Sequence, residues 1–137
     1  MYNPKNYKNL IVWQKAKELV LKIYHIQESF PKEEIYGLSE QMKRASISCA
    51  SNIAEGNQRK TSKEKIRFLN ISQSSLIELD CQLELALNLH FLNKKEYMET
   101  LEIINKTSYL LTRFIQSELD KTPIDRIYPI NPKNNES

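Results

Sequence analysis

The feature that most limits how this chain can fold is its scarcity of residues that interrupt helices. Only two glycines and five prolines occur in 137 residues, and Pro123, Pro129 and Pro132 lie within the last fifteen. Glycine and proline are the residues least tolerated inside a helix, so the region before these prolines is free to form long helices. We therefore expect an all-α protein, and its length fits a single domain.

Apolar residues recur at alternating spacings of three and four in four segments, which is the pattern of a helix that buries one face. The expected helices span residues 10–29, 38–56, 61–89 and 93–119. Gly56 is expected to end the second helix in the left-handed conformation. The side chains of Thr61 and Asn93 are expected to cap the third and fourth helices. Because the link between these two helices is short, we predict an antiparallel up-down four-helix bundle.

The predicted organisation is an N-terminal arm over residues 1–9, the bundle over residues 10–119, and a C-terminal tail over residues 120–137 that is rich in Pro and Asn. No apolar run is long enough to cross a bilayer, and the first residues lack the apolar stretch of an export signal. Cys49 and Cys81 form no CxxC pair and have no histidine cluster nearby. We therefore expect a cytoplasmic protein without a membrane partner, disulfide, metal or cofactor.

The second and third helices carry apolar residues on two sides. A second stripe of small or aliphatic side chains lies roughly opposite the predicted core face. Its members are Ile47, Ala50, Ala54, Ile71 and Leu85. A single bundle would leave this stripe in water, so we expect a homo-oligomer with these residues in its interface.

Positive charge is concentrated at the turn between the second and third helices. The cations are Arg59, Lys60, Lys63, Lys65 and Arg67. Lys and Arg at this density neutralise phosphates, so the turn is a candidate site for RNA or DNA. The alternative is a solvated helix entry with no ligand, because cations are mildly unfavourable at a helix N-terminus.

Arg44, on the flank of the second helix, is expected to pair with Glu78 or Asp80 of the third, which would fix the helix register or a contact between subunits. The remaining polar residues show no catalytic pattern. Glu55 has no second carboxylate in matching register, and the histidines and the serines of the second helix lack the spacing of a metal site or a catalytic triad. We therefore expect a protein that is not an enzyme.

One aromatic group has two interpretations. Trp13, with Tyr7 and Tyr24, offers a stacking surface for unpaired bases. Trp13 also follows directly on Val12, a residue of the predicted core stripe. This position favours a packing role for the indole ring.

Several motifs resemble those of one known family. They are residues 10–16 (LIVWQKA), residues 36–38 (YGL), the NIAEG ending of the second helix with Asn52, Glu55 and Gly56, Arg59, and Ser75 with Glu78. Over residues 7–114 the chain resembles the 23S rRNA intervening-sequence proteins, also called S23-type ribosomal proteins. One departure is Ser74, at a position where the family usually has Gly.

The resemblance implies a bundle that assembles as a homopentameric ring and whose biochemical role is poorly defined. A related branch, the accessory variability proteins of diversity-generating retroelements, is similar in fold and binds a reverse transcriptase and nucleic acid. Together with the charge pattern, the resemblance leads us to expect a non-enzymatic homo-oligomer associated with RNA or a nucleoprotein through residues 59–67. The alternative is a protein-binding scaffold, such as an accessory subunit of a polymerase or reverse transcriptase, without direct nucleic-acid contact.

Overall fold

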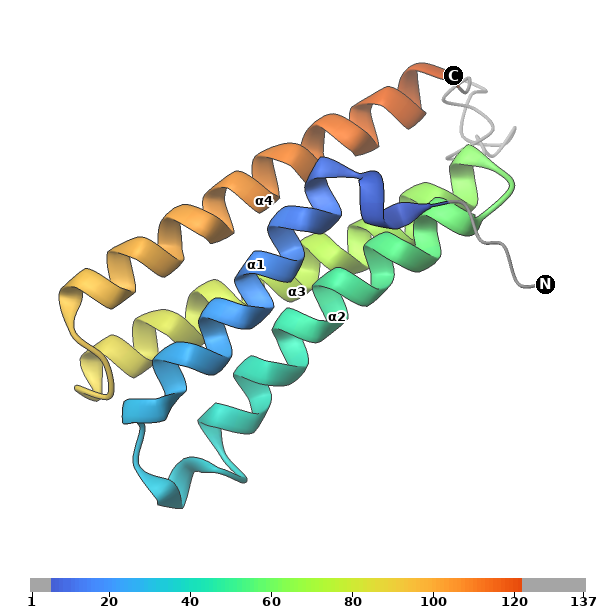
Figure 1. The fold of residues 1–137 in the computed structure, drawn as a ribbon. Helices are drawn as coiled ribbons and strands as arrows, with labels where there is room; N and C mark the ends of the chain where they lie inside the picture. The colour runs from blue at the N-terminus through green and yellow to red at the C-terminus, as the bar shows by residue number, and fades with distance from the viewer. Residues whose placement is uncertain (1–5, 122–137) are drawn as a thin grey trace, which may run out of the picture.

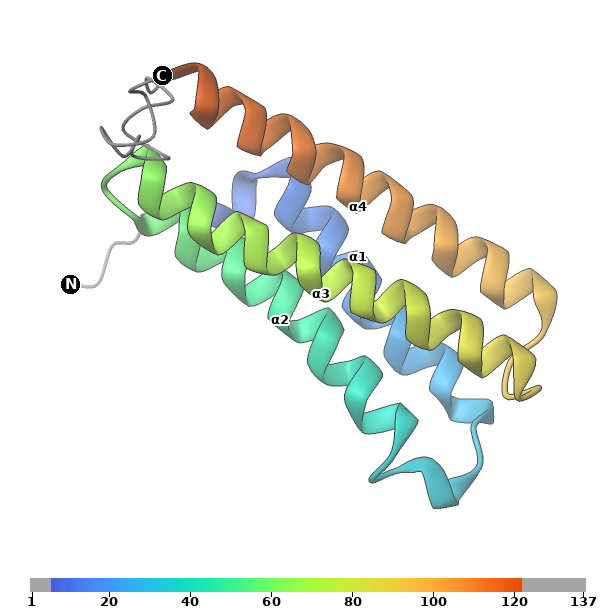
Figure 2. The same ribbon diagram turned by 180° about the vertical axis from the view of Figure 1, so that it is seen from behind.

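Helices and short 3₁₀ turns make up the part of the chain that the computed structural model describes, residues 6–121. The helices are α1 (Ile11–Ile26), α2 (Leu38–Gln58), α3 (Ser62–Asn88) and α4 (Lys94–Lys121). These residues contain no strand, so the prediction of an all-α fold is confirmed. Figures 1 and 2 show the four helices side by side, with the α1–α2 and α3–α4 connections at one end and the α2–α3 turn at the other.

Consecutive helices are in contact, and α1 also contacts α4, so the helices surround one core. The inward stripes expected from the apolar spacing form this core. Its fully buried side chains include Leu19, Ile23, Met42, Ile53, Leu69, Leu79, Leu83 and Leu111. α4 also buries Thr100 and Thr107, whose hydroxyls donate to carbonyl oxygens one turn earlier at 2.7 and 2.8 Å. These hydrogen bonds offset the penalty of burying a hydroxyl group.

The expected helix caps are present. The Thr61 hydroxyl accepts a hydrogen bond from the N–H of Glu64 at 3.1 Å, and the Asn93 side chain accepts one from the N–H of Glu96 at 2.8 Å. These bonds satisfy donors that the first turn of a helix leaves unpaired. Both helices therefore begin within one residue of the predicted positions.

The end of α2 differs from the prediction. α2 continues to Gln58 with Gly56 inside it, and no described glycine has a positive φ. A Cβ atom at Gly56 would lie 3.1 Å from Cβ of Phe68 and 3.4 Å from the carbonyl oxygen of Lys65. A side chain at this position would press against α3, which passes close to Gly56. The prediction of a left-handed cap at Gly56 is therefore wrong.

A left-handed residue occurs instead after α3, and it is not a glycine. His90 has a φ of 64°, and the N–H groups of His90 and Phe91 donate to the carbonyl oxygens of Leu87 and Ala86 at 3.0 and 2.9 Å. This pair of bonds closes the C-terminal end of the helix. The ring of Phe91 packs against Phe30, with centroids 5.4 Å apart. This contact joins the α1–α2 connection to the α3–α4 connection.

Three predicted boundaries shift by a few residues. α1 ends at Ile26, and Gln27–Ser29 form a 3₁₀ turn. α4 continues to Lys121, inside the predicted tail. Tyr7–Asn9 of the predicted arm form a 3₁₀ turn that contacts α1 and α2. The rest of the predicted arm, up to residue 5, and of the tail, from residue 122, lies outside the described residues.

Candidate nucleic-acid interface at the turn between α2 and α3

The basic cluster lies where α2 turns into α3. Arg59 and Lys60 are in the link itself, and Lys63, Lys65 and Arg67 are in the first two turns of α3. Figure 1 places this turn at the same end of the bundle as the C-terminal end of α4. The cluster is therefore positioned by the end of one helix and the capped start of the next.

Both arginines of the cluster lie over the same aromatic ring. The guanidinium carbons of Arg59 and Arg67 lie 4.5 and 4.7 Å from the ring centroid of Phe68. Arg59 also faces Glu55 at 3.9 Å, and Arg67 faces Glu64 at 3.7 Å. These ion pairs are long and exposed to solvent, so they contribute little to stability. The ring positions both guanidinium groups while leaving them accessible to an anion.

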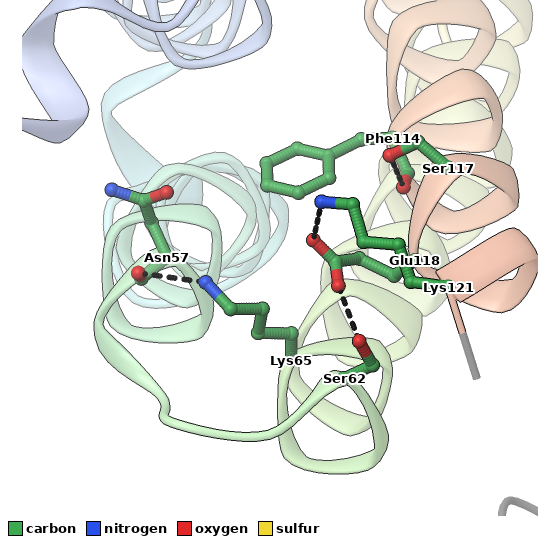
Figure 3. Close-up of polar contacts among 7 residues, drawn as sticks. All are labelled: Asn57, Ser62, Lys65, Phe114, Ser117, Glu118 and Lys121. Carbon is green, nitrogen blue, oxygen red and sulfur yellow. Dashed lines mark hydrogen bonds and ion pairs between the residues drawn. The ribbon is translucent and has the colours of Figure 1, made fainter.

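The lysines of the cluster have different surroundings. Lys65 Nζ donates to the carbonyl oxygen of Asn57 at 3.1 Å, which ties α3 to the last turn of α2 (Figure 3). Lys60 and Lys63 are exposed, and the described residues place no carboxylate within 4.0 Å of either ammonium group. The carboxylates of Glu55 and Glu64 face Arg59 and Arg67, which leaves the charges of Lys60 and Lys63 without a carboxylate partner in the described part of the chain.

A buried carboxylate that the sequence pattern did not reveal lies beside the turn. Glu118 of α4 is 4% exposed and accepts hydrogen bonds from the Ser62 hydroxyl at 2.6 Å and from Lys121 Nζ at 3.2 Å (Figure 3). Burial opposes its ionisation, but these hydrogen bonds and the charges of Lys121 and Lys65 lower the pKa of Glu118. The sequence did contain one indication that Glu118 is buried: it lies seven residues after Leu111, on the inward stripe.

The NIAEG motif packs α2 against α3. The Asn52 amide nitrogen donates to the carbonyl oxygen of Ser48 at 2.8 Å and to its hydroxyl at 3.2 Å, and the Ser75 hydroxyl donates to that of Ser48 at 2.9 Å. Gly56 meets α3 one turn later. Ser74, which differs from the usual family residue, is exposed.

Within the chain, Arg44 does not pair with α3. Its guanidinium faces Glu40, one turn earlier on α2, at 2.8 Å, and its side chain is 78% exposed. Glu78 accepts a hydrogen bond from Gln82 at 3.3 Å, and Asp80 is exposed. The predicted pairing with Glu78 or Asp80 is wrong within one chain because the i, i+4 spacing offers Arg44 a nearer carboxylate. A contact of Arg44 with another subunit stays a prediction.

The predicted interface residues fall on two surfaces. One is a hollow of about 320 Å³ between α1 and α2. Its lining includes Ile47, Ala50, Ala54, Trp13 and Leu21. Ile71 and Leu85 lie on α3, which does not border this hollow, and they are 39% and 49% exposed. The apolar surface is therefore divided between two faces of the bundle.

The other candidate groups are simple to place. Cys49 is buried, which raises its pKa to about 12, whereas Cys81 is exposed. Within residues 6–121, no three His, Cys, Asp or Glu side chains gather into a group suited to a metal ion. None of the described helices has the length and apolar character needed to cross a bilayer.

The fold and the site together define a small four-helix protein with a basic turn at one end and apolar side chains open on two faces. The chain belongs to the 23S rRNA-intervening sequence protein family, whose sequence profile matches residues 8–113. The family membership predicted from the motifs is thus confirmed.

A solved structure is also similar to this chain. It is a protein with unknown function from the S23 ribosomal protein family of Bacteroides thetaiotaomicron VPI-5482, with a TM-score of 0.71 and 23% sequence identity. The match covers 77% of this chain and 98% of that chain. At this identity the likeness supports the fold alone. A comparison with curated proteins finds no match.

Proposed function

We propose that this protein is a non-enzymatic homo-oligomer that binds RNA through the turn between α2 and α3. The observation that carries the proposal is the pair Lys60 and Lys63, which are exposed and have no carboxylate partner among the described residues. Arg59 and Arg67, positioned over Phe68, extend the same positive surface. Cations of this kind bind phosphates by releasing counterions, which makes the affinity dependent on salt.

The family supports RNA as the nucleic acid. Its members are described by their relation to 23S rRNA intervening sequences. Folded RNA offers closely spaced phosphates together with unpaired loops. The proposal places the protein in the cytoplasm, where the free thiols of Cys49 and Cys81 stay reduced.

Self-association is part of the proposal because two different apolar surfaces are open. The α1–α2 hollow with Ala50 and Ala54 is one, and the α3 surface with Ile71 and Leu85 is the other. Two distinct surfaces on one subunit suit a head-to-tail contact, which forms a ring when the rotation closes. We take the subunit to be an up-down bundle and the ring to hold five copies, as the family resemblance implies. Such a ring repeats the basic turn and raises avidity for RNA.

Filter binding of RNA at two salt concentrations tests the basic turn. The double change Lys60→Gln with Lys63→Gln removes two exposed charges without touching the core. We expect weaker binding and a salt slope smaller by about one for each phosphate that is no longer neutralised. The control, Lys32→Gln with Lys94→Gln, removes the same charge at the opposite end of the bundle and should bind like the wild type. Equal binding by both double variants would reject the turn as the RNA site.

Light scattering tests the assembly. Ala50→Glu places a charge in the α1–α2 hollow, so we expect it to reduce the oligomer mass while the circular dichroism spectrum stays helical. Arg44→Gln should also reduce the mass if Arg44 pairs with Glu78 or Asp80 of a second subunit. A wild-type mass near the 16.1 kDa of one chain would contradict the homo-oligomer.

A protein-binding scaffold is the second candidate function. It is supported by large apolar side chains that stand exposed away from the basic turn. They include Leu21, Ile77, Met98 and Tyr109. Exposed apolar groups suit a protein partner such as a polymerase or reverse transcriptase. An oligomer that binds no RNA at low salt would replace the first function with this one.

A further inference from the structure

Trp13 stands at the start of α1 beside an open hollow. Its indole ring is half-buried against the core, and the Tyr7 ring meets it edge-on, with centroids 5.0 Å apart and planes at 71°. These contacts hold the indole ring in one orientation. The ring lines the α1–α2 hollow of the proposed subunit interface, and it also borders a second hollow of about 580 Å³ to which α2 contributes no residue. The lining of this hollow is Lys8, Trp13, Gln14, Lys17, Glu18 and Leu21.

The hollow beside Trp13 carries uncompensated positive charge. Lys17 Nζ lies over the face of the Trp13 ring, 5.9 Å from its centroid, and Lys8 is exposed on the preceding 3₁₀ turn. Neither ammonium group has a carboxylate within 4.0 Å among residues 6–121. The carboxylate in the lining, Glu18, is paired with Lys15 Nζ at 2.8 Å. An aromatic ring with two cations that have no carboxylate partner among the described residues suits an anion that carries a flat ring.

We propose that this hollow binds one unpaired nucleotide of RNA, whose base displaces the Lys17 ammonium group from the face of Trp13 and stacks there, with its flanking phosphates on Lys8 and Lys17. The proposal rests on the RNA-binding function proposed above and names the form of RNA, a single strand. Gln14 adds a polar group to the site. Its amide nitrogen donates to the carbonyl oxygen of Lys8 at 3.1 Å, which leaves its amide oxygen to accept from a base N–H.

The position of the hollow favours a single strand over a duplex. The 3₁₀ turn Tyr7–Asn9 contacts both α1 and α2, and Figure 1 shows the start of α1 near the end of the bundle where α2 turns into α3. One strand crossing this end meets phosphate contacts at the basic turn and a stacking site at Trp13. A duplex cannot stack a base on Trp13 unless it first unpairs and unstacks that base, which costs energy.

The test uses the fluorescence of Trp13, the only tryptophan in the chain. An oligouridylate of roughly 12 nucleotides, added to the full-length protein, should quench this fluorescence at low salt and lose its effect as salt rises. A blunt-ended RNA duplex of equal charge, which has no unpaired base, should bind with much less quenching. Tighter binding of an oligothymidylate DNA of equal length would overturn the choice of RNA.

Two variants separate the stacking from the charge. Lys8→Gln with Lys17→Gln leaves the indole in place and should lower the salt slope by about 0.7 for each phosphate that is no longer neutralised. The control, Lys32→Gln with Lys94→Gln, should leave the quenching unchanged. Trp13→Leu should weaken oligouridylate binding in a filter assay about 5- to 140-fold. Because Trp13 also packs on the core, a thermal melt must show that this variant is folded, and the lysine variant tests the site independently.

The outcomes separate this site from the basic turn. Unchanged Trp13 fluorescence at saturating oligouridylate, with binding abolished in the Lys60 and Lys63 variant, overturns the nucleotide site and leaves the proposed function intact. Quenching that depends on Lys8 and Lys17 but not on Lys60 and Lys63 supports the nucleotide site and rejects the basic turn. Failure of both RNAs to bind overturns both proposals.

Discussion

Replacing Glu118 should destabilise the end of the bundle where α3 begins and α4 ends. Its buried carboxylate accepts from the Ser62 hydroxyl at 2.6 Å and from Lys121 Nζ at 3.2 Å. A hydrogen bond to a charged group contributes about 1.5–3 kcal/mol. Lys121 is 65% exposed, so solvent screens its ion pair with Glu118. Most of the stabilisation therefore comes from the hydrogen bond that Ser62 donates. We expect Glu118→Ala to lower the free energy of unfolding by about 2–3 kcal/mol and Glu118→Gln, which can still accept from Ser62, by about 1 kcal/mol.

Urea unfolding at neutral and acid pH measures this effect in a second way. The pKa of Glu118 is lowered by folding, so its carboxylate stabilises the fold above the ordinary pKa of 4.5. That contribution is lost as the pH falls through the lower folded pKa. The difference between the wild type and Glu118→Gln should therefore shrink progressively as the pH falls below 4.5.

An exposed glutamate of the same helix provides the control for these measurements. Glu102 pairs with Lys106 at 3.4 Å, and Glu102→Gln should change the free energy of unfolding by less than about 0.5 kcal/mol. An equally mild effect of Glu118→Ala would contradict a stabilising role for the buried carboxylate. So would a difference between the wild type and Glu118→Gln that persists at acid pH.

Gly56→Ala should lower the free energy of unfolding because its Cβ would lie 3.1 Å from Cβ of Phe68, and Gly56→Leu should lower it further, by about 1–3 kcal/mol. A more stable Gly56→Ala variant in urea unfolding would show that helix propensity outweighs the close approach. A thiol reagent at about pH 8 should modify Cys81 rapidly and Cys49 only on unfolding, since burial raises the pKa of Cys49 to about 12. Equal rates would contradict this burial. Thr61→Ala should lower the free energy of unfolding by about 1 kcal/mol, whereas Thr61→Ser keeps the capping hydroxyl and should match the wild type.

The helices were predictable because their determinants are local. The spacing of residues such as Leu79 and Leu83 marks the buried face, and Thr61 and Asn93 mark helix starts through bonds that span three residues. Gly56 was misinterpreted because a glycine near a helix end serves either a left-handed cap or a close approach by another helix. Only the position of α3 distinguishes these two uses.

The candidate site was predictable in its charges but not in their partners. The five cations are close in sequence, so their clustering needs no tertiary information. The ring beneath Arg59 and the carbonyl group that holds Lys65 depend on how α3 leaves the turn. Glu118 is 56 residues from Ser62, and no local pattern relates these two positions. Arg44 was assigned to α3 although Glu40 lay within its own helix.

We expect the pairing of α1 with α4 to be the last contact that forms as the bundle folds. Consecutive helices are joined by short connections, so they meet early and lose little chain entropy in doing so. The α1–α4 pairing joins distant parts of the chain, as shown by Lys22 Nζ, which lies 2.7 Å from Glu99 Oε2, 77 residues away. We expect the contact between α1 and α4 to form after the folding transition state. Lys22→Gln should therefore accelerate unfolding in stopped-flow measurements and leave the folding rate nearly unchanged.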